Sequence, residues 1–200
     1  MRRSVSTASS ERTKAYDHAV SRDAPSEAQI AAGDFAVWLR EMAAVVRGEG
    51  SADVPCAGCT ACCRSSQFVH IEPDETDTLA HIPPALLFPA PQRPSGHMVM
   101  GYDERGHCPM LINDLCSIYE HRPRTCRAYD CRMFAATGVA VADDQRDLGA
   151  RVARWRFDFS DAAAVDKYET LHKIARELSD RNPTERAAVA IALATGAATP

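Results

Sequence analysis

Apolar residues recur at three- and four-residue steps in two parts of the chain, one before residue 50 and one after residue 140. In the first part, Ser26 can cap a helix with Gln29 three residues later, and Gly48 can end it, so the spacing predicts one long helix between them. Trp38 falls on the apolar stripe of this helix. We therefore expect Trp38 in the core rather than in a binding site.

The second amphipathic part lies at the C-terminus. Its pattern predicts helices over residues 143–196, broken where polar capping residues, proline or glycine interrupt the apolar spacing. Asn182 followed by Pro183 marks one such break, and Gly196 ends the last helix. The expected segments are 143–155, 161–178 and 184–194.

Between these parts the pattern changes to short alternating runs and many prolines. Alternation and β-branched residues predict strands, whereas proline-rich stretches predict loops. Gly106 lies at a turn between two such runs, which indicates a small β-hairpin. The expected elements are a strand at 67–71, a short helix at 72–80, a loop at 82–94, a hairpin of 97–102 with 107–111, and a helical turn at 117–120.

Together these elements predict an α+β fold that is mainly helical, with helices flanking a loop-rich, cysteine-cluster core that holds the hairpin. Residues 1–25 are polar and are expected to be a disordered tail. Residues 26–200 are then a single domain, with a metal-binding core at 56–132 and the C-terminal helices at 143–196.

Composition narrows the function classes. The chain has 200 residues, a net charge of −4 and a pI near 6.0, which argues against a nucleic-acid partner. No run approaches about eighteen consecutive apolar residues, so we expect no membrane span. The two arginines near the N-terminus are not followed by the apolar stretch of a signal peptide, so we expect a cytoplasmic protein.

All eight cysteines lie between residues 56 and 131. In a reducing cytoplasm, clustered cysteines are more often metal ligands than disulfides. The two-residue gaps of the first group let several soft thiolates reach one ion, as in zinc sites and the first part of a bacterial ferredoxin run. The spacing indicates a metal without choosing between an iron–sulfur cluster and zinc. The groups are Cys56, Cys59, Cys62 and Cys63; Cys108 and Cys116; and Cys126 and Cys131.

Three separated motifs carry a resemblance to a known family. They read Cys-Ala-Gly-Cys-Thr-Ala-Cys-Cys from residue 56, Cys-Pro-Met-Leu from residue 108, and Cys-Ser-Ile-Tyr-Glu-His-Arg-Pro-Arg-Thr-Cys-Arg from residue 116. In this order they resemble the cysteine-cluster family of zinc- or iron-chelating domains (YkgJ-type, CxxCxxCC). A flagellin lysine methylase that resembles the same family is thought to carry a 4Fe–4S cluster. Cys131 lies outside the shared pattern. The resemblance implies a site built from Cys56, Cys59, Cys62, Cys63, Cys108, Cys116 and Cys126.

Charged and aromatic residues accompany the cysteines. A thiolate site is anionic, so nearby guanidinium groups can stabilise it, and Arg122 and Arg127 are the cofactor-binding candidates. The alternative is that these arginines, with Arg64, Arg124 and Arg132, are solvated or bind a partner. We expect Tyr119 to pack over the site. Histidines are suitable ligands by type, but eight cysteines make them unnecessary, and His107 is the best placed of them.

Three functions fit these observations. The first is a metal-binding protein with a cysteine-ligated iron–sulfur cluster (4Fe–4S) that serves in redox transfer or in modifying a protein partner. The second is a structural zinc module that supports protein–protein interaction. The third is the catalytic component of a protein methylase-like system, although no Gly-rich loop for a nucleotide or methyl donor is present.

Overall fold

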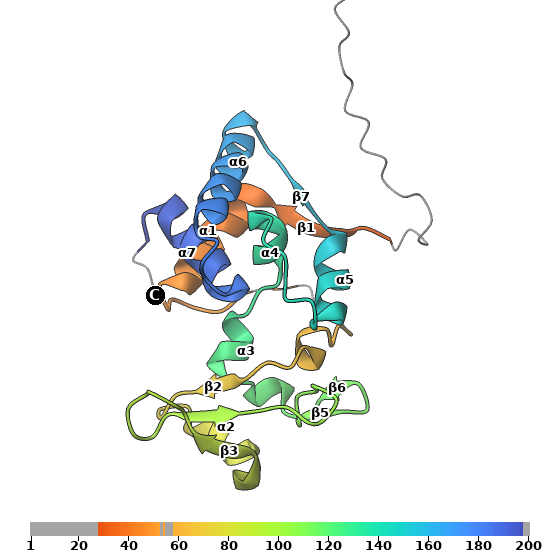
Figure 1. Cartoon of the computed structure of the whole chain (residues 1–200), viewed down its shortest axis with the longest axis vertical. Helices are drawn as coiled ribbons and strands as arrows, with labels where there is room; N and C mark the ends of the chain where they lie inside the picture. The colour runs from red at the N-terminus through yellow and green to blue at the C-terminus, as the bar shows by residue number, and fades with distance from the viewer. Residues whose placement is uncertain (1–27, 53, 55–57, 198–200) are drawn as a thin grey trace, which may run out of the picture.

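The structure is a computed structural model that describes residues 28–52, 54 and 58–197. Within these residues the chain forms two parts stacked along the long axis, with helix α3 (Arg124–Ala128) between them (Figure 1). One part is helical, and the other is the segment 58–130, which we call the cysteine module. The mainly helical α+β class is therefore confirmed. The expected tail at 1–25 and the ligand candidate Cys56 lie outside the described residues.

The helical part is built on one apolar core. Phe35, Phe134, Leu148, Leu171 and Ile191 are almost completely shielded from solvent in it, and Trp38 is 3% exposed, as expected for a core residue. Its helices are α1 (Phe35–Val46), α4 (Arg132–Thr137), α5 (Arg146–Arg154), α6 (Ala162–Glu177) and α7 (Pro183–Thr195).

The last two helices begin and end at the residues that the sequence indicates. Asp161 caps α6 by accepting a 2.8 Å hydrogen bond from the Ala164 amide. Asn182 caps α7 in the same way, at 3.0 Å from the Glu185 amide, with Pro183 in the first turn. Gly196 ends α7 with a φ of +67°, in the left-handed region that favours glycine.

Two strands in this part were not predicted. β1 (Ile30–Asp34) runs parallel to β7 (Trp155–Asp158), so the predicted first helix begins only at Phe35 and the predicted helix 143–155 ends at Arg154. Asp34 sets the start of α1, because its carboxylate accepts a hydrogen bond from the Val37 amide at 2.9 Å. The partner of each strand lies more than a hundred residues away, and local periodicity cannot reveal such pairing.

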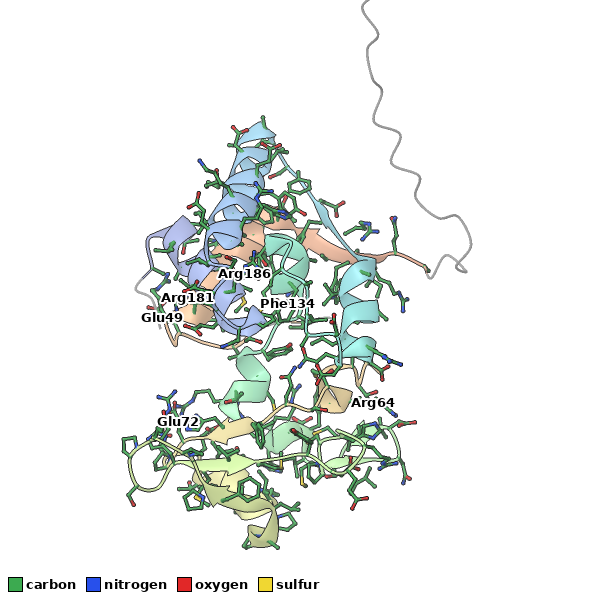
Figure 2. All side chains as sticks on the ribbon, viewed as in Figure 1. Glu49, Arg64, Glu72, Phe134, Arg181 and Arg186 are labelled. Atoms are coloured by element: carbon green, nitrogen blue, oxygen red, sulfur yellow. The ribbon has the colours of Figure 1, made fainter. Side chains whose placement is uncertain are left out.

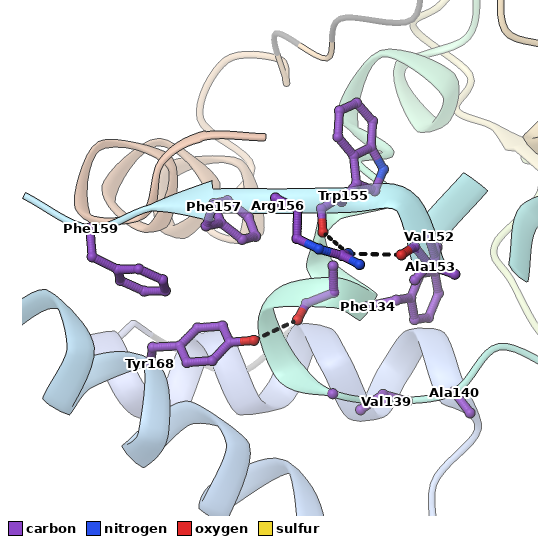
Figure 3. Close-up of a pocket in the computed structure, with 12 residues that line it drawn as sticks. Phe134, Val139, Ala140, Val152, Ala153, Trp155, Arg156, Phe157, Phe159 and Tyr168 are labelled. Atoms are coloured by element: carbon purple, nitrogen blue, oxygen red, sulfur yellow. Dashed lines mark hydrogen bonds between the residues drawn. The ribbon is translucent and has the colours of Figure 1, made fainter. Parts of the chain in front are cut away.

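A cavity of about 510 Å³ opens beside β7, α4 and α6 (Figure 3). Its few polar groups are satisfied by backbone. Arg156 donates to the carbonyls of Ala153 and Trp155 at 2.8 and 2.7 Å, and the Tyr168 hydroxyl donates to that of Ala135 at 3.4 Å. Because no cysteine, carboxylate or histidine lines this cavity, it is not a candidate metal site.

The cysteine module has a small core of its own, separate from the helical one. A three-stranded antiparallel sheet in the order β2–β4–β3 forms one wall, with β2 at Val69–Ile71, β3 at Leu87–Pro89 and β4 at Met98–Met100. The strand near 67–71 is thus confirmed, and the short helix expected at 72–80 is α2 (Thr76–His81). The buried members of this core are Val69, Ile71, Ile82, Met100, Met110 and Ile118.

The hairpin lies one turn later than predicted. Residues 98–100 pair with β2 and β3 instead of with 107–111, and the turn at Asp103 closes through the His107 carbonyl without a ladder. The hairpin is formed by β5 (Leu111–Ile112) and β6 (Leu115–Cys116). Its turn residues Asn113 and Asp114 have φ values of +50° and +61°, which suit a tight hairpin turn. The expected 82–94 loop also contains β3.

The connections of the module contain three turns of 3₁₀ helix: η1 (Cys62–Arg64), η2 (Pro84–Leu86) and η3 (Tyr119–His121), of which the last is the helical turn expected near 117–120. Among the described residues, no helix is both long enough and apolar enough to cross a bilayer.

Candidate metal centre

Four cysteines from the three motifs are near enough for Cys62 and Cys116 to raise the pKa values of Cys108 and Cys126, although no three of the described cysteine sulfurs lie within 4.8 Å of one another. Cys62 begins η1, Cys108 follows the turn after β4, Cys116 lies in β6, and Cys126 lies in α3. Cys108, Cys116 and Cys126 are partly buried and pack against the small core of the module. The fold therefore gathers thiols that are 64 residues apart in sequence, from Cys62 to Cys126.

The thiols are close enough to influence one another electrostatically. Burial, together with the neighbouring Cys62, Cys108 and Cys116, raises the pKa of Cys126 to about 12. Burial also raises the pKa of Cys108, to which Cys116 and Cys62 contribute. Several thiolates in one partly dry place repel one another, and a bound cation removes that repulsion. This donor set fits a metal ion or an iron–sulfur cluster.

The Cys108 sulfur accepts hydrogen bonds from the chain that follows it. The backbone amides of Met110 and Leu111 donate to it and lower its pKa, opposing the effect of burial. Pro109 lies between and has no amide to donate. Amide donors directed at a sulfur stabilise its thiolate form and tune a metal bound to it. The Cys-Pro-Met-Leu motif therefore favours negative charge on the Cys108 sulfur.

The adjacent cysteines Cys62 and Cys63 lie on a 3₁₀ turn rather than on extended backbone. Their thiols form a hydrogen bond that, with burial and the charge of Cys63, raises the pKa of Cys62 well above its usual range. The Cys63 carbonyl accepts a 2.7 Å hydrogen bond from the Cys108 amide. This bond ties the first motif to the second.

Cys59 has a different setting, and it lines a pocket of about 350 Å³ between its loop and α5. The guanidinium groups of Arg64, Arg151 and Arg154 also line this pocket, with Asp147 as the acidic group. Figure 2 shows Arg64 at the η1 edge of the module. The pocket places positive charge beside the first cysteine motif, where thiolates need it.

Cys131 is set apart from the other cysteines. It is 6% exposed and belongs to the core of the helical part. The indole Nε1–H of Trp155 donates to its sulfur at 3.2 Å. Cys131 is thus a core residue, as its position outside the family pattern indicates.

The arginines in and just after the third motif have different partners. Arg122 lowers the pKa of Cys126, so its charge reaches the thiols. Arg127 donates to the Arg122 carbonyl and lies 3.9 Å from the carboxylate of Glu75. Arg124 instead pairs with Glu72 and Asp74, and Arg132 pairs with the buried Asp130. Arg124 and Arg132 therefore form ion pairs with carboxylates rather than contacts with the thiols.

Two tyrosines beside the cysteine motifs have different surroundings. Tyr119 is 54% exposed, and the guanidinium of Arg122 stacks on its ring with a centroid distance of 3.6 Å. The expected packing of Tyr119 over the thiols stays a prediction. Tyr129 is partly buried: desolvation raises its pKa, as do Cys131 and Cys62, and its hydroxyl accepts a 3.2 Å hydrogen bond from Gln67. Only its position three residues after Cys126 could have indicated this role.

Comparison with known proteins agrees with this geometry. Residues 55–145 match the family model CxxCxxCC, described as "Putative zinc- or iron-chelating domain". This segment is a CxxCxxCC domain. The matched residues include every cysteine of the module and continue into Cys131 and the start of the helical part. No curated protein and no solved structure matches the chain. The match supports a zinc- or iron-chelating domain and determines neither the metal nor its role.

Proposed function

We propose that the CxxCxxCC domain holds an iron–sulfur cluster, of the 4Fe–4S type, through the cysteines of its three motifs. The observation that carries this proposal is that Cys62, Cys108 and Cys116 each raise the pKa of Cys126, with Cys108, Cys116 and Cys126 partly buried against the module core. Cys56, Cys59 and Cys63 of the first motif supply further thiolates. When bound, such a cluster supplies one-electron transfer or an electrophilic iron atom.

The surroundings of the thiols support a redox role. Amide donors on Cys108 and the charge of Arg122 near Cys126 both stabilise negative charge on sulfur, and such contacts set the reduction potential of a cluster. Arg122 and Arg127 are the residues that would neutralise the cluster. The role in the cell is then electron transfer to, or modification of, a protein partner in the cytoplasm.

A structural zinc site is the second candidate, and the size of the module core favours it. Six buried apolar side chains hold a segment of more than seventy residues with short strands, and such a segment gains stability from a metal. In that case the module would be folded by zinc and would present its surface to a protein partner, without redox chemistry.

Reduction under anaerobic conditions separates these functions. Protein purified without oxygen is treated with dithionite and examined by electron paramagnetic resonance and visible absorbance. We expect broad visible absorbance that bleaches on reduction and a paramagnetic signal from the reduced cluster. A colourless protein without a signal, with zinc bound, would support the structural alternative instead.

Arg122→Gln should lower the reduction potential of the cluster while the cluster is retained, because a positive charge near the sulfurs is lost. Arg40→Gln, on the exposed side of α1, is the control.

A further inference from the structure

A second group of metal-ligating side chains lies in the cysteine module and contains no thiol. It consists of Asp77 and His81 in α2 and His121 at the end of η3, and one ligand atom of each lies within 4.8 Å of the others. Of the residues that the structure describes, no other group of three histidine, cysteine or carboxylate side chains meets this criterion. The sequence pattern did not suggest it, because the cysteines made histidine ligands unnecessary.

Local structure brings the three residues together. Asp77 and His81 are four residues apart in α2, so their side chains share one face of the helix. His121 is followed by Arg122 and Pro123, and the proline ends η3 before the chain enters α3. Helix α2 and η3 pack together, which places His121 over the shared face of α2.

The distances are those of a nearly assembled ligand set. His121 Nδ1 is 2.8 Å from one carboxylate oxygen of Asp77, and His81 Nδ1 is 3.7 Å from the other. The two imidazole rings stack with their centroids 3.5 Å apart and their planes at 6°. His121 and the charge of His81 lower the pKa of Asp77, which therefore stays ionised near neutral pH. One carboxylate thus serves two imidazoles.

We propose that Asp77, His81 and His121 form a binding site for one divalent transition-metal ion, with Zn²⁺ the best-suited ion by donor type, independent of the cysteine centre. Two imidazole nitrogens and one carboxylate oxygen are a common donor set for such ions. These nitrogen and oxygen donors differ from the soft sulfur donors of the cysteine centre. The remaining coordination positions face solvent and would be filled by water.

Binding requires one adjustment of the side chains. Stacked rings direct their nitrogens along parallel planes, so one imidazole must turn about its outer torsion to converge with the other on a single ion. Both side chains have the room to do so, since they are 41% and 38% exposed. The hydrogen bond from His81 Nδ1 to the Asp77 carbonyl, at 2.8 Å, is the contact that this turn exchanges for the metal.

A second histidine pair in the same module provides a matched control. His70 and His97 also stack, with centroids 5.1 Å apart and planes at 9°, and their ring nitrogens are 3.0 Å apart. This pair belongs to no group of three ligating side chains within the described residues. Replacing His97 therefore removes a stacked histidine of the module without touching the proposed site.

Cobalt(II) titration of the purified holoprotein tests the proposal. We expect one equivalent to bind with weak visible bands and without the intense near-ultraviolet absorption of a cobalt–thiolate bond. Asp77→Asn and His121→Ala should each weaken binding by about tenfold or more, whereas His97→Ala should bind as the parent does. Competition with Zn²⁺ should remove the cobalt bands.

Two results would overturn the proposal: cobalt–thiolate absorption as the main signal, or equal binding by the parent and Asp77→Asn proteins. Asp77→Asn preserves size at an exposed position, so folding does not confound it. Iron and zinc retained before titration are measured in the same samples. A missing cobalt site with the cysteine-bound metal still present would contradict this inference alone and leave the proposed function standing.

Discussion

The indole Nε1–H of Trp38 donates a 2.7 Å hydrogen bond to Asp130 Oδ2, joining α1 to the end of the cysteine module. Asp130 is 1% exposed and also binds the guanidinium of Arg132, whose Nη1 reaches the Ala32 carbonyl at 2.9 Å. This buried contact connects the metal-binding part to the helical part. Asp130 lies four residues after Cys126.

Asp130→Asn should destabilise the protein by about 3–5 kcal/mol, because it leaves the buried charge of Arg132 without a counter-ion. Denaturant unfolding followed by circular dichroism measures the change. Arg47→Gln, which removes an exposed ion pair with Glu49, is the control and should leave the unfolding midpoint unchanged. Equal midpoints for Asp130→Asn and the parent would show that the contact does not hold the two parts together.

Cys126→Ala and Cys131→Ala should separate the metal ligands from the core cysteine. Cys126 lies among the thiols, and its loss should remove most of the bound metal. Cys131 lies under the Trp155 indole, and its loss should cost roughly 1 kcal/mol of stability with the metal content unchanged. Metal content per folded chain is the measurement. Metal loss in Cys131→Ala would place that residue in the site and refute its assignment to the core.

Removal of the metal should loosen the cysteine module and spare the helical part. The module core has six buried residues, whereas the helical core is larger and contains no proposed ligand. Hydrogen exchange after chelation should therefore show faster exchange in β4, β5 and β6 and continued protection in α1, α6 and α7. Uniform loss of protection would mean that the two cores unfold as one unit.

His172 should make stability depend on pH. Partial burial and the nearby charge of Arg176 lower its pKa, and its buried Nε2 has no hydrogen-bond partner among the described residues. The unfolded chain then binds the proton more readily than the folded one, so stability is complete above the unfolded pKa of about 6.5 and falls as pH decreases through it. His172→Asn should reduce the loss of stability between about pH 7.5 and about pH 5. An identical loss in both proteins would exclude His172 as its source.

Gly138 and Gly196 together test whether the close approach of His172 to Gly138 excludes a larger side chain there. Both end helices with nearly the same φ, +66° and +67°. A Cβ at Gly138 would lie 2.7 Å from the His172 imidazole, whereas one at Gly196 would meet nothing within 4 Å. Thermal unfolding should show Gly138→Ala to be less stable than Gly196→Ala by about 1 kcal/mol or more. Equal stability would mean that His172 moves aside freely.

The sequence predicted elements that depend on local signals. The break at Asn182 and Pro183 and the ending of α7 at Gly196 were predicted, because each involves residues a few positions apart. The parallel pairing of β1 with β7 was not, since neither strand carries a signal of a partner so distant in sequence. The hairpin was misplaced because two turns follow each other closely, and only the second one, at Asn113 and Asp114, closes a ladder.

The candidate metal centre was predictable as far as the spacing of the cysteines indicates metal ligation. The cysteines marked it, and the shared motifs separated Cys131 from the others. Residue type alone does not distinguish the partly buried Tyr129 from the exposed Tyr119. The cluster of Asp77, His81 and His121 depends on the packing of α2 against η3, which joins residues 44 positions apart.

Counting metals and sulfide in protein purified without oxygen tests the central claim most directly. The account predicts about four iron atoms and about four acid-labile sulfides per chain, with broad visible absorbance, and their loss in Cys126→Ala. One zinc ion per chain, with no sulfide and no colour, would contradict it.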